Sequence, residues 1–299
     1  MSNLYNGRSV EREESKAEFN ISHLLDTDGF NIEFHSHNFV EIYLSISGGK
    51  HFIINDKIYT IKPGDIFVSN VNEIHRVIAN DKDVYERYIF EFKPIFVLPY
   101  CTAETDLLHY VYNRDKNFSH QVSLNESQFR EILSLIEKYE SLEAQRYGSD
   151  ILKKVCYIEI LTFISEVYLT APVPLRTQHS SNHSIRIVAD TLEYISSNLT
   201  ADLSLDNIAK HIGLGKYHLC KLFKDKTGTT INKYIVSCRI AKAKSLLSSG
   251  SSVTNACQES GFHDISHFVR TFHNAVGLSP GKYAQDNKNA KVYYEEYIK

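Results

Sequence analysis

The sequence predicts an α+β protein, in which an N-terminal β-barrel with two helices precedes an all-α domain of two helix-turn-helix motifs joined by a long helix. Three observations predict it. Short runs that alternate in hydrophobicity fill residues from about 30 to 96, and the period becomes helical from residue 123. In the last third, a pattern of small residues and glycines then recurs after 48 positions.

Composition and charge exclude several classes of protein. Hydrophobic residues make up 42% and charged residues 23% of the 299 positions, which is typical of a folded chain. No apolar run approaches 18 residues and the first 19 residues are polar, so we expect a cytoplasmic protein without a secretory signal or a membrane span. The five cysteines form no CxxC pair, so neither a zinc knuckle nor a disulfide framework is indicated.

The strands of the barrel follow from alternation and turn residues. Asn55 and Asp56 separate two apolar runs and are typical of a tight hairpin turn. Gly48-Gly49 and Pro63-Gly64 predict turns between the neighbouring segments. The predicted strands cover residues 40–46, 51–54, 57–61, 66–69 and 84–92. Short strands at this spacing favour a barrel or sandwich.

Two helices are expected after the strands. Ser123 and Glu126 have the spacing of a capping box, and apolar residues recur at helical spacing up to Tyr139. Gly148 interrupts the pattern before a second helix over residues 151–167. The pair, residues 121–170, could cover the barrel or pair with another subunit, and we expect it to mediate dimerisation. Residues 171–182, which contain Pro172 and Pro174, form the clearest linker.

Charge divides the chain unevenly. Residues 183–285 contain 12 Lys and Arg against 7 Asp and Glu, whereas residues 1–182 contain 18 against 26. The near-neutral average therefore hides a basic module attached to an acidic one. Such an asymmetry points the C-terminal module toward an anionic partner.

The basic module contains an internal repeat. Ala209 and Gly213 recur as Cys257 and Gly261, and Phe223 and Gly228 recur as Phe272 and Gly277. A small residue followed four positions later by glycine suits a helix-turn-helix, because the small side chain admits the second helix and glycine accepts the turn. A helix over about 230–247 joins the copies and could place two recognition helices one DNA turn, ~34 Å, apart.

Helical spacing separates the two faces of each recognition helix. In the first, over residues 216–226, Leu219, Leu222 and Phe223 should face the core; in the second, Phe268 and Phe272 should do so. The candidate DNA-binding residues on the opposite faces are Tyr217, Cys220, Lys221 and Lys224 in the first copy, and Ser266, Val269 and Arg270 in the second.

This module resembles the DNA-binding domain of the arabinose-regulator (AraC) family of bacterial transcription factors. The resemblance covers about 100 residues and rests on Gly261-Phe262, Phe268-x-Arg270-x-Phe272 and Gly277-x-Ser279-Pro280-x-x-Tyr283. It implies base contacts from Tyr217, Cys220, Lys221, Ser266, Val269 and Arg270. The sequence departs from the family in having Gly215 in place of a capping serine and His273 in place of a lysine. Lys221 and Arg270 should therefore dominate base reading, since both can bond guanine O6 and N7.

The N-terminal half contains a candidate metal or effector site. His35, His37 and Glu41 share parity and would project from one face of a continuous strand, and His75 from a later strand could complete three histidines and one carboxylate. The segment resembles the first motif of the cupin barrel. The second motif is partial, because Gly64 and His75 are present but Asn70, Asn72 and Ala79 differ. The residues could hold a divalent metal, fix the fold, or line an organic-ligand pocket with Tyr43, Phe34, Phe39 and Phe52.

The resemblance implies a transcriptional regulator and not an enzyme, with no catalytic residues. Its implied parts are an effector-sensing cupin-like domain (1–120), a dimerisation segment (121–170), a linker (171–182), the double helix-turn-helix domain (183–285) and a C-terminal tail (286–299). The implied partners are promoter DNA, a small-molecule effector with a carbohydrate as leading candidate, a second copy of the chain and RNA polymerase, with no membrane partner. Two alternatives stay open: a constitutive dimeric regulator without an effector, and a metal-dependent cupin enzyme fused to a DNA-binding module.

Overall fold

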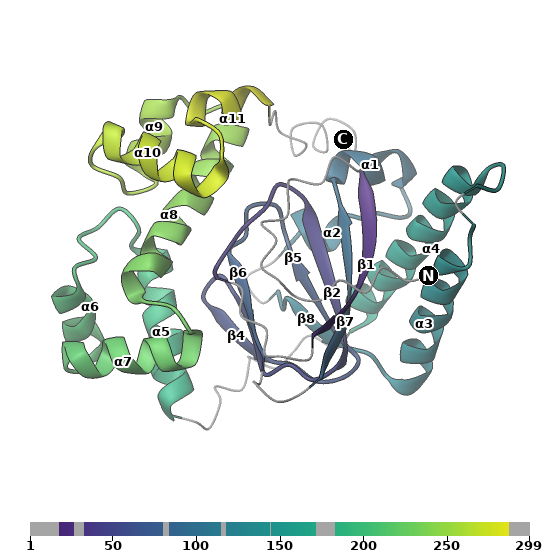
Figure 1. The fold of residues 1–299 in the computed structure, drawn as a ribbon, viewed down its shortest axis with the longest axis horizontal. Helices are drawn as coiled ribbons and strands as arrows, with labels where there is room; N and C mark the ends of the chain where they lie inside the picture. The colour runs from purple at the N-terminus through teal and green to yellow at the C-terminus, as the bar shows by residue number, and fades with distance from the viewer. Residues whose placement is uncertain are drawn as a thin grey trace.

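The computed structural model describes residues 18–26, 33–79, 84–114, 118–143, 145–171 and 183–286. A twisted β-barrel carries a pair of long helices on one side, and an all-helical body lies against its opposite side (Figure 1). The predicted fold class is therefore confirmed. Residues 172–182 of the predicted linker and 287–299 of the tail lie outside the described residues.

Two antiparallel sheets form the barrel. The larger has the order β1 (Phe19–Asp26), β7 (Tyr85–Phe92), β2 (Val40–Ser47), β5 (Asp65–Ser69) and β8 (Gln121–Ser123). The smaller has the order β4 (Lys57–Thr60), β3 (His51–Ile54) and β6 (His75–Ile78). The two-residue turn between β3 and β4 is confirmed, and Asn55 adopts the positive φ of 52° that such a turn requires.

Several short elements were not expected from the sequence. Strand β1 pairs with β7 along its whole length, yet most of its residues are only half-buried, so its hydrophobic alternation is weak. Strand β8 is three residues long. Helix α1 (Pro94–Val97), a 3₁₀ turn (Leu98–Tyr100) and helix α2 (His109–Tyr112) follow the last long strand and are too short to produce a helical period.

Helices α3 (Glu126–Glu140) and α4 (Ser149–Thr170) pack on the larger sheet. The predicted capping box is wrong by two residues. Asn125 caps α3 by accepting the backbone N–H of Gln128 on its side chain, and the Gln128 side chain accepts the backbone N–H of Asn125. Ser123 instead belongs to β8, where its hydroxyl donates to Asp65 Oδ1 at 2.6 Å. The strand therefore extends to Ser123, and the helix begins only after Asn125.

The helical body contains both predicted motifs. It comprises α5 (His183–Ser197), α6 (Leu205–Ile212), α7 (Lys216–Thr227), α8 (Ile231–Ser248), α9 (Val253–Glu259), α10 (Ile265–Val276) and α11 (Pro280–Asp286). Helices α6 and α7 form the first helix-turn-helix, α9 and α10 form the second, and α8 joins them. Leu219, Phe223, Phe268 and Phe272 are buried as expected, while Leu222 is half-buried.

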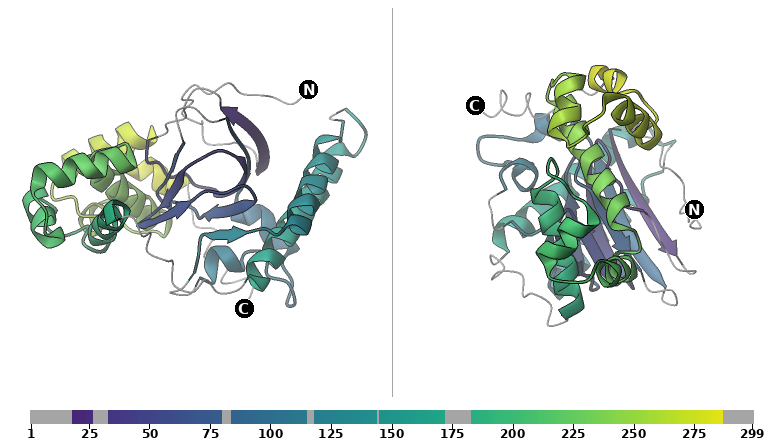
Figure 2. Two further views of the ribbon diagram at one scale, coloured as in Figure 1. Left: turned by 90° about the horizontal axis from the view of Figure 1, so that it is seen from below. Right: turned by 90° about the vertical axis from the view of Figure 1, so that its left-hand side faces the viewer.

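The helical body docks on the smaller sheet, as the two views in Figure 2 show. Phe34, Ile53 and Ile74 of the barrel share one hydrophobic cluster with α5 to α8. Tyr234 of α8 donates its hydroxyl to Asn55 O at 2.8 Å across this interface. Among the described residues, no helix combines the length and hydropathy needed to cross a bilayer.

Candidate functional site

Three histidines meet at one end of the barrel. His35 lies in the segment before β2 and forms an isolated β-bridge with His75 of β6, with two backbone hydrogen bonds of 3.2 and 2.9 Å. His37 follows, and Glu41 is the second residue of β2. The predicted continuous strand is wrong, because β2 begins only at Val40 and His35 pairs with the other sheet. The bridge nevertheless brings all four predicted residues together, and we call them the histidine cluster.

Each histidine of the cluster is held by a backbone carbonyl two residues away. The acceptors are Glu33 O at 3.1 Å from His35 Nδ1, Phe39 O at 2.9 Å from His37 Nδ1, and Glu73 O at 3.0 Å from His75 Nδ1. A carbonyl oxygen can only accept, so Nδ1 carries the proton in all three rings and Nε2 keeps its lone pair. This is the arrangement that orients histidine for metal coordination.

The donor atoms of the cluster lie near enough to one another to approach a common metal ion. One ligand atom from each histidine lies within 4.8 Å of the other two. Glu41 places its two oxygens 3.4 Å from His37 Nε2 and 3.5 Å from His75 Nε2. Ligands on a common ion with bonds of about 2.0–2.2 Å lie roughly 3–3.5 Å apart. Three imidazoles and one carboxylate suit a divalent transition metal.

Two features of His37 and His75 support a ligand at this position. Their Nε2 atoms are buried and make no well-aligned hydrogen bond among the described residues, although the Glu41 oxygens lie 3.4 and 3.5 Å away, and a buried polar atom without such a bond costs free energy. Burial also lowers the pKa of His37 and lowers that of His75 to about 4, although Glu41 opposes the shift. Both rings are therefore neutral near pH 7, the state in which imidazole binds a metal.

The aromatic residues expected around an organic ligand lie in different places. Tyr43 is 1% exposed inside the barrel, where its hydroxyl contacts that of Tyr85, and Phe52 lies between it and His75. Phe39 stacks on His37, and Phe34 packs on Tyr234 at the docking interface. These side chains fill the core of the barrel and its contacts instead of lining one shared cavity.

The recognition helices present most of the predicted DNA-binding residues to solvent. On α7, Tyr217 is 88% exposed and Lys221 and Lys224 are exposed, whereas Cys220 is half-buried against the core. On α10, Ser266 and Arg270 are exposed, and Val269 is half-buried and packs on the second motif. The long cationic side chains that these faces expose are therefore Lys221, Lys224 and Arg270.

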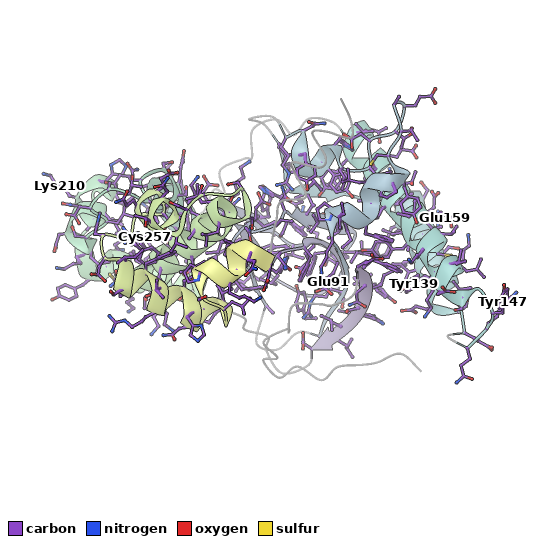
Figure 3. All side chains as sticks on the ribbon, turned by 90° about the horizontal axis from the view of Figure 1, so that it is seen from above. Glu91, Tyr139, Tyr147, Glu159, Lys210 and Cys257 are labelled. Carbon is purple, nitrogen blue, oxygen red and sulfur yellow. The ribbon has the colours of Figure 1, made fainter. Side chains whose placement is uncertain are left out.

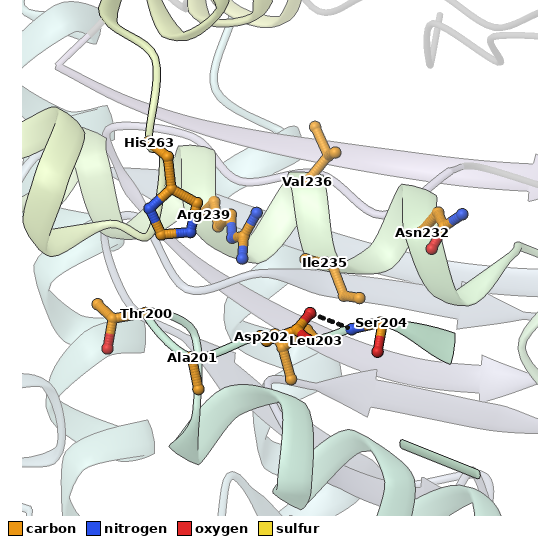
Figure 4. A pocket seen from close by; sticks show the side chains of 10 residues that line it. All are labelled: Thr200, Ala201, Asp202, Leu203, Ser204, Asn232, Ile235, Val236, Arg239 and His263. Carbon is orange, nitrogen blue, oxygen red and sulfur yellow. Dashed lines mark hydrogen bonds between the residues drawn. The ribbon is translucent and has the colours of Figure 1, made fainter. Parts of the chain in front are cut away.

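A groove separates the two motifs. It has a volume of about 660 Å³ and lies between the α5–α6 loop, α8 and the turn before α10 (Figure 4). Arg239 of α8 and His263 of the turn before α10 both line it, and Arg239 Nε donates to Leu199 O at 3.1 Å. The sequence did not single out this groove, because its walls come from three segments that become neighbours only in the fold.

The comparisons with known proteins match both halves of the chain. The family model of the AraC-like ligand binding domain matches residues 23–152, and that of a helix-turn-helix domain matches residues 208–286. The uncharacterized HTH-type transcriptional regulator YfiF of Bacillus subtilis is 24% identical over 273 residues, which cover 89% of this chain and 83% of that protein. The HTH-type transcriptional activator AarP of Providencia stuartii is 32% identical over 118 residues, which cover 39% of this chain and 87% of AarP.

Solved structures also align with this chain. Unsaturated fatty acid bound wild-type ToxT from Vibrio cholerae is 18% identical and aligns with a TM-score of 0.38. The alignment covers 91% of this chain and 96% of that one.

Proposed function

Because the chain belongs to the AraC family of DNA-binding transcriptional regulators with a ligand-binding domain, we propose that α7 and α10 read bases in adjacent major grooves of promoter DNA. One observation carries this proposal. The outer faces of both helices stay exposed while the helical body docks on the barrel through other surfaces. Their exposed lysines and arginine offer both phosphate contacts and base contacts.

Lys221 and Arg270 are the residues we assign to base reading, and Tyr217, Lys224 and Ser266 support them from the same faces. Cys220 and Val269 are half-buried, so their contribution would be limited to short apolar contacts. Replacing Lys221 or Arg270 by alanine should weaken specific binding by about 1–3 kcal/mol and relax the preference at one base step.

The test is footprinting of the full-length protein on retained genomic fragments, across a salt series. Lys242→Ala is the matched control, because Lys242 is an exposed lysine on α8 outside both recognition helices. We expect its site preference to equal that of the wild type. If Lys221→Ala and Arg270→Ala both keep the wild-type preference, the assignment of these two helices is wrong.

We propose further that the histidine cluster is the effector site and takes a divalent transition metal. The buried Nε2 atoms, which make no well-aligned hydrogen bond among the described residues, favour this over a purely structural role. Such an ion, when bound, would supply a positive charge held by His35, His37, His75 and Glu41. A carbohydrate effector stays a prediction. The rival enzyme would require metal-dependent turnover that survives removal of residues 183–299.

Calorimetric titration with Zn²⁺ and with Mn²⁺ tests the site. His35→Asn should lower affinity at least tenfold, because one ligand is lost at an unchanged backbone. His218→Asn is the control, since His218 is exposed on α7 far from the cluster in sequence. Equal uptake by the wild type and His35→Asn would refute the site.

We also propose that α4 forms the homodimer contact. It leaves Ile151, Val155 and Leu169 exposed by 62%, 55% and 67%, and a monomer gains nothing from exposing them. Figure 3 shows Tyr147 projecting just before this helix. Val155→Glu should dissociate the dimer in sedimentation velocity, whereas Thr170→Glu, an exposed position of the same helix, should not. The expected contact with RNA polymerase stays a prediction.

A further inference from the structure

The groove between the two helix-turn-helix motifs has the size of a small-molecule site. Its volume is about 660 Å³, and such sites usually have about 300–1,000 Å³. Helix α8 forms one wall, and the α5–α6 loop and the turn before α10 form the others (Figure 4). As far as the described residues form it, the lining includes no member of the histidine cluster and no residue of α7 or α10. The functions proposed above therefore make no use of this groove.

Arg239 gives the groove a positive charge in a fixed position. Its Nε donates to Leu199 O at 3.1 Å, and its guanidinium carbon lies 6.0 Å from the ring centre of Phe262. Gly261 leaves the space for this arrangement, because a Cβ there would clash with Leu199 O and lie 2.9 Å from Arg239 Nε. Two contacts thus hold the guanidinium, while its remaining N–H donors bond to no described residue.

Arg239 has no anionic partner in the part of the chain that the structure describes. Asp202 is the acidic residue of the lining, and its carboxylate instead accepts from the backbone N–H of Ser204 at 3.0 Å and from the side chain of Asn207 at 2.9 Å. Burial lowers the pKa of Arg239, and no carboxylate of a described residue opposes that shift. A half-buried cation without a counter-ion favours an anion in the space beside it.

Four apolar side chains contribute to the same lining. They are Ile235 and Val236 of α8 and Ala201 and Leu203 of the α5–α6 loop. A surface that follows a DNA backbone carries several lysines and arginines, whereas the described lining contains one arginine and no lysine. A molecule with an apolar body and one acidic group therefore fits the groove better than a row of phosphates does.

We propose that this groove binds a small organic acid, whose carboxylate pairs with the Arg239 guanidinium and whose apolar part lies against Ile235 and Val236. The two Nη nitrogens offer parallel N–H donors to a carboxylate, so the pair also orients the ligand. The walls come from both motifs, because the loop precedes α6 and the turn precedes α10. A ligand that contacts both walls therefore links the two motifs within the helical body.

The probe is 2-naphthoate, which joins a planar apolar body to a carboxylate, and the matched neutral ligand is 2-naphthamide. In calorimetric titration of the full-length protein, 2-naphthoate should bind at least about tenfold more tightly than 2-naphthamide, because a charge-assisted hydrogen bond contributes more than a neutral one. Hydrogen exchange locates the ligand. It should slow in both walls, residues 199–204 and 261–264, when 2-naphthoate is added.

Two variants test the contacts. Arg239→Gln removes the charge, so it should weaken 2-naphthoate binding at least about tenfold and leave 2-naphthamide binding unchanged, which shows that the groove is still formed. Ala201→Phe places a large side chain in the groove from an exposed loop position and should abolish binding of both ligands. Arg186→Gln is the control, since Arg186 is an exposed arginine of α5 outside the lining, and it should bind both ligands as the wild type does.

Four results would overturn the proposal. Equal affinity of the wild type for the two ligands would exclude a carboxylate contact. An equal effect of Arg239→Gln on both ligands would assign Arg239 a structural role. Binding of 2-naphthoate that Ala201→Phe leaves intact would place the ligand elsewhere. Absence of saturable 2-naphthoate binding would also overturn it, and if Arg239→Gln then reduced the salt slope of DNA binding by about one, the anion beside Arg239 would be a DNA phosphate.

Discussion

The two helix-turn-helix motifs repeat the same plan but differ in what they pack against. The core of the first, with Phe223 and Leu219, is continuous with barrel residues Phe34, Ile53 and Ile74. The core of the second, with Phe268 and Phe272, contains only residues from Ile240 to Tyr283. Tyr283 of this core donates its hydroxyl to Asn72 Oδ1 of the barrel at 3.4 Å. The repeat therefore yields one motif whose hydrophobic core includes barrel residues and one whose hydrophobic core does not.

Because of this difference, we expect a ligand in the barrel to affect the two motifs by different routes. It would act on the first motif through the shared hydrophobic core, and on the second through α8 and the Tyr283 contact. Lys244 lies on α8, with its ammonium 5.8 Å from the ring centre of Tyr283, where both routes meet. The following changes separate the motifs, beginning with the largest expected effect.

Replacing one core phenylalanine of either motif by alanine should lower the free energy of unfolding by about 3–5 kcal/mol. The two variants should differ in whether the loss of protection extends to the barrel. Phe223 contacts Tyr234, which packs on Phe34 of the barrel, so Phe223→Ala should also raise hydrogen exchange in the β3–β4 hairpin. Phe272 contacts Phe268 and Tyr283, so Phe272→Ala should leave that hairpin protected. Equal loss of protection in both variants would show that the two cores are one cooperative unit.

The residues that end the recognition helices give a finer comparison. Gly228 and Gly277 have φ of 70° and 77°, where an alanine costs about 1–2 kcal/mol. A Cβ on Gly277 meets no atom within 4 Å, whereas one on Gly228 meets the guanidinium of buried Arg76. Both variants should lower the free energy of unfolding, but only Gly228→Ala should weaken docking. Scattering would detect this as a larger radius of gyration, and identical radii would contradict it.

The sequence predicted the helical half closely because its signals are local. Caps, a repeated glycine and a helical period define α6, α7 and α8 within one or two residues. The barrel was harder, since β1 is a half-buried edge strand and Ser123 lies in a strand instead of a capping box. In both cases tertiary pairing decided the outcome over local pattern.

The histidine cluster was found from an incorrect premise. Parity along one strand suggested the set, but the bridge between His35 and His75 assembles it. Lys244 and Ser36 are 208 positions apart, so no local pattern could reveal their contact. Lys244 is buried, whereas Lys233 and Lys242 of the same helix are exposed. The difference comes from the barrel segment that packs on Lys244, and no single segment of the sequence predicts that contact.

A smaller effect concerns how the recognition helices begin. Asp264 caps α10 by accepting the backbone N–H of His267. Asp264→Ala should cost about 1 kcal/mol and should fray the end of α10 that carries Ser266. Thermal unfolding followed by calorimetry measures the cost. Asp286→Ala is the control, since this exposed carboxylate pairs with Lys282 in the last turn of α11 and caps no recognition helix. An unchanged midpoint in Asp264→Ala would contradict the role of the cap.

The smallest effect tests the same position of the first motif. Gly215 precedes α7 with the extended backbone of a helix cap but has no side chain to accept a bond. Because its φ of −64° suits any residue and a Cβ would meet no atom within 4 Å, Gly215→Ser should stabilise α7 by a few tenths of a kcal/mol. If the first motif owes its order mainly to the barrel, this gain should be larger in Tyr234→Phe, where docking is weaker, than in the wild type. Calorimetric melting of the four combinations measures that difference, and strict additivity would show that the start of α7 is insensitive to docking.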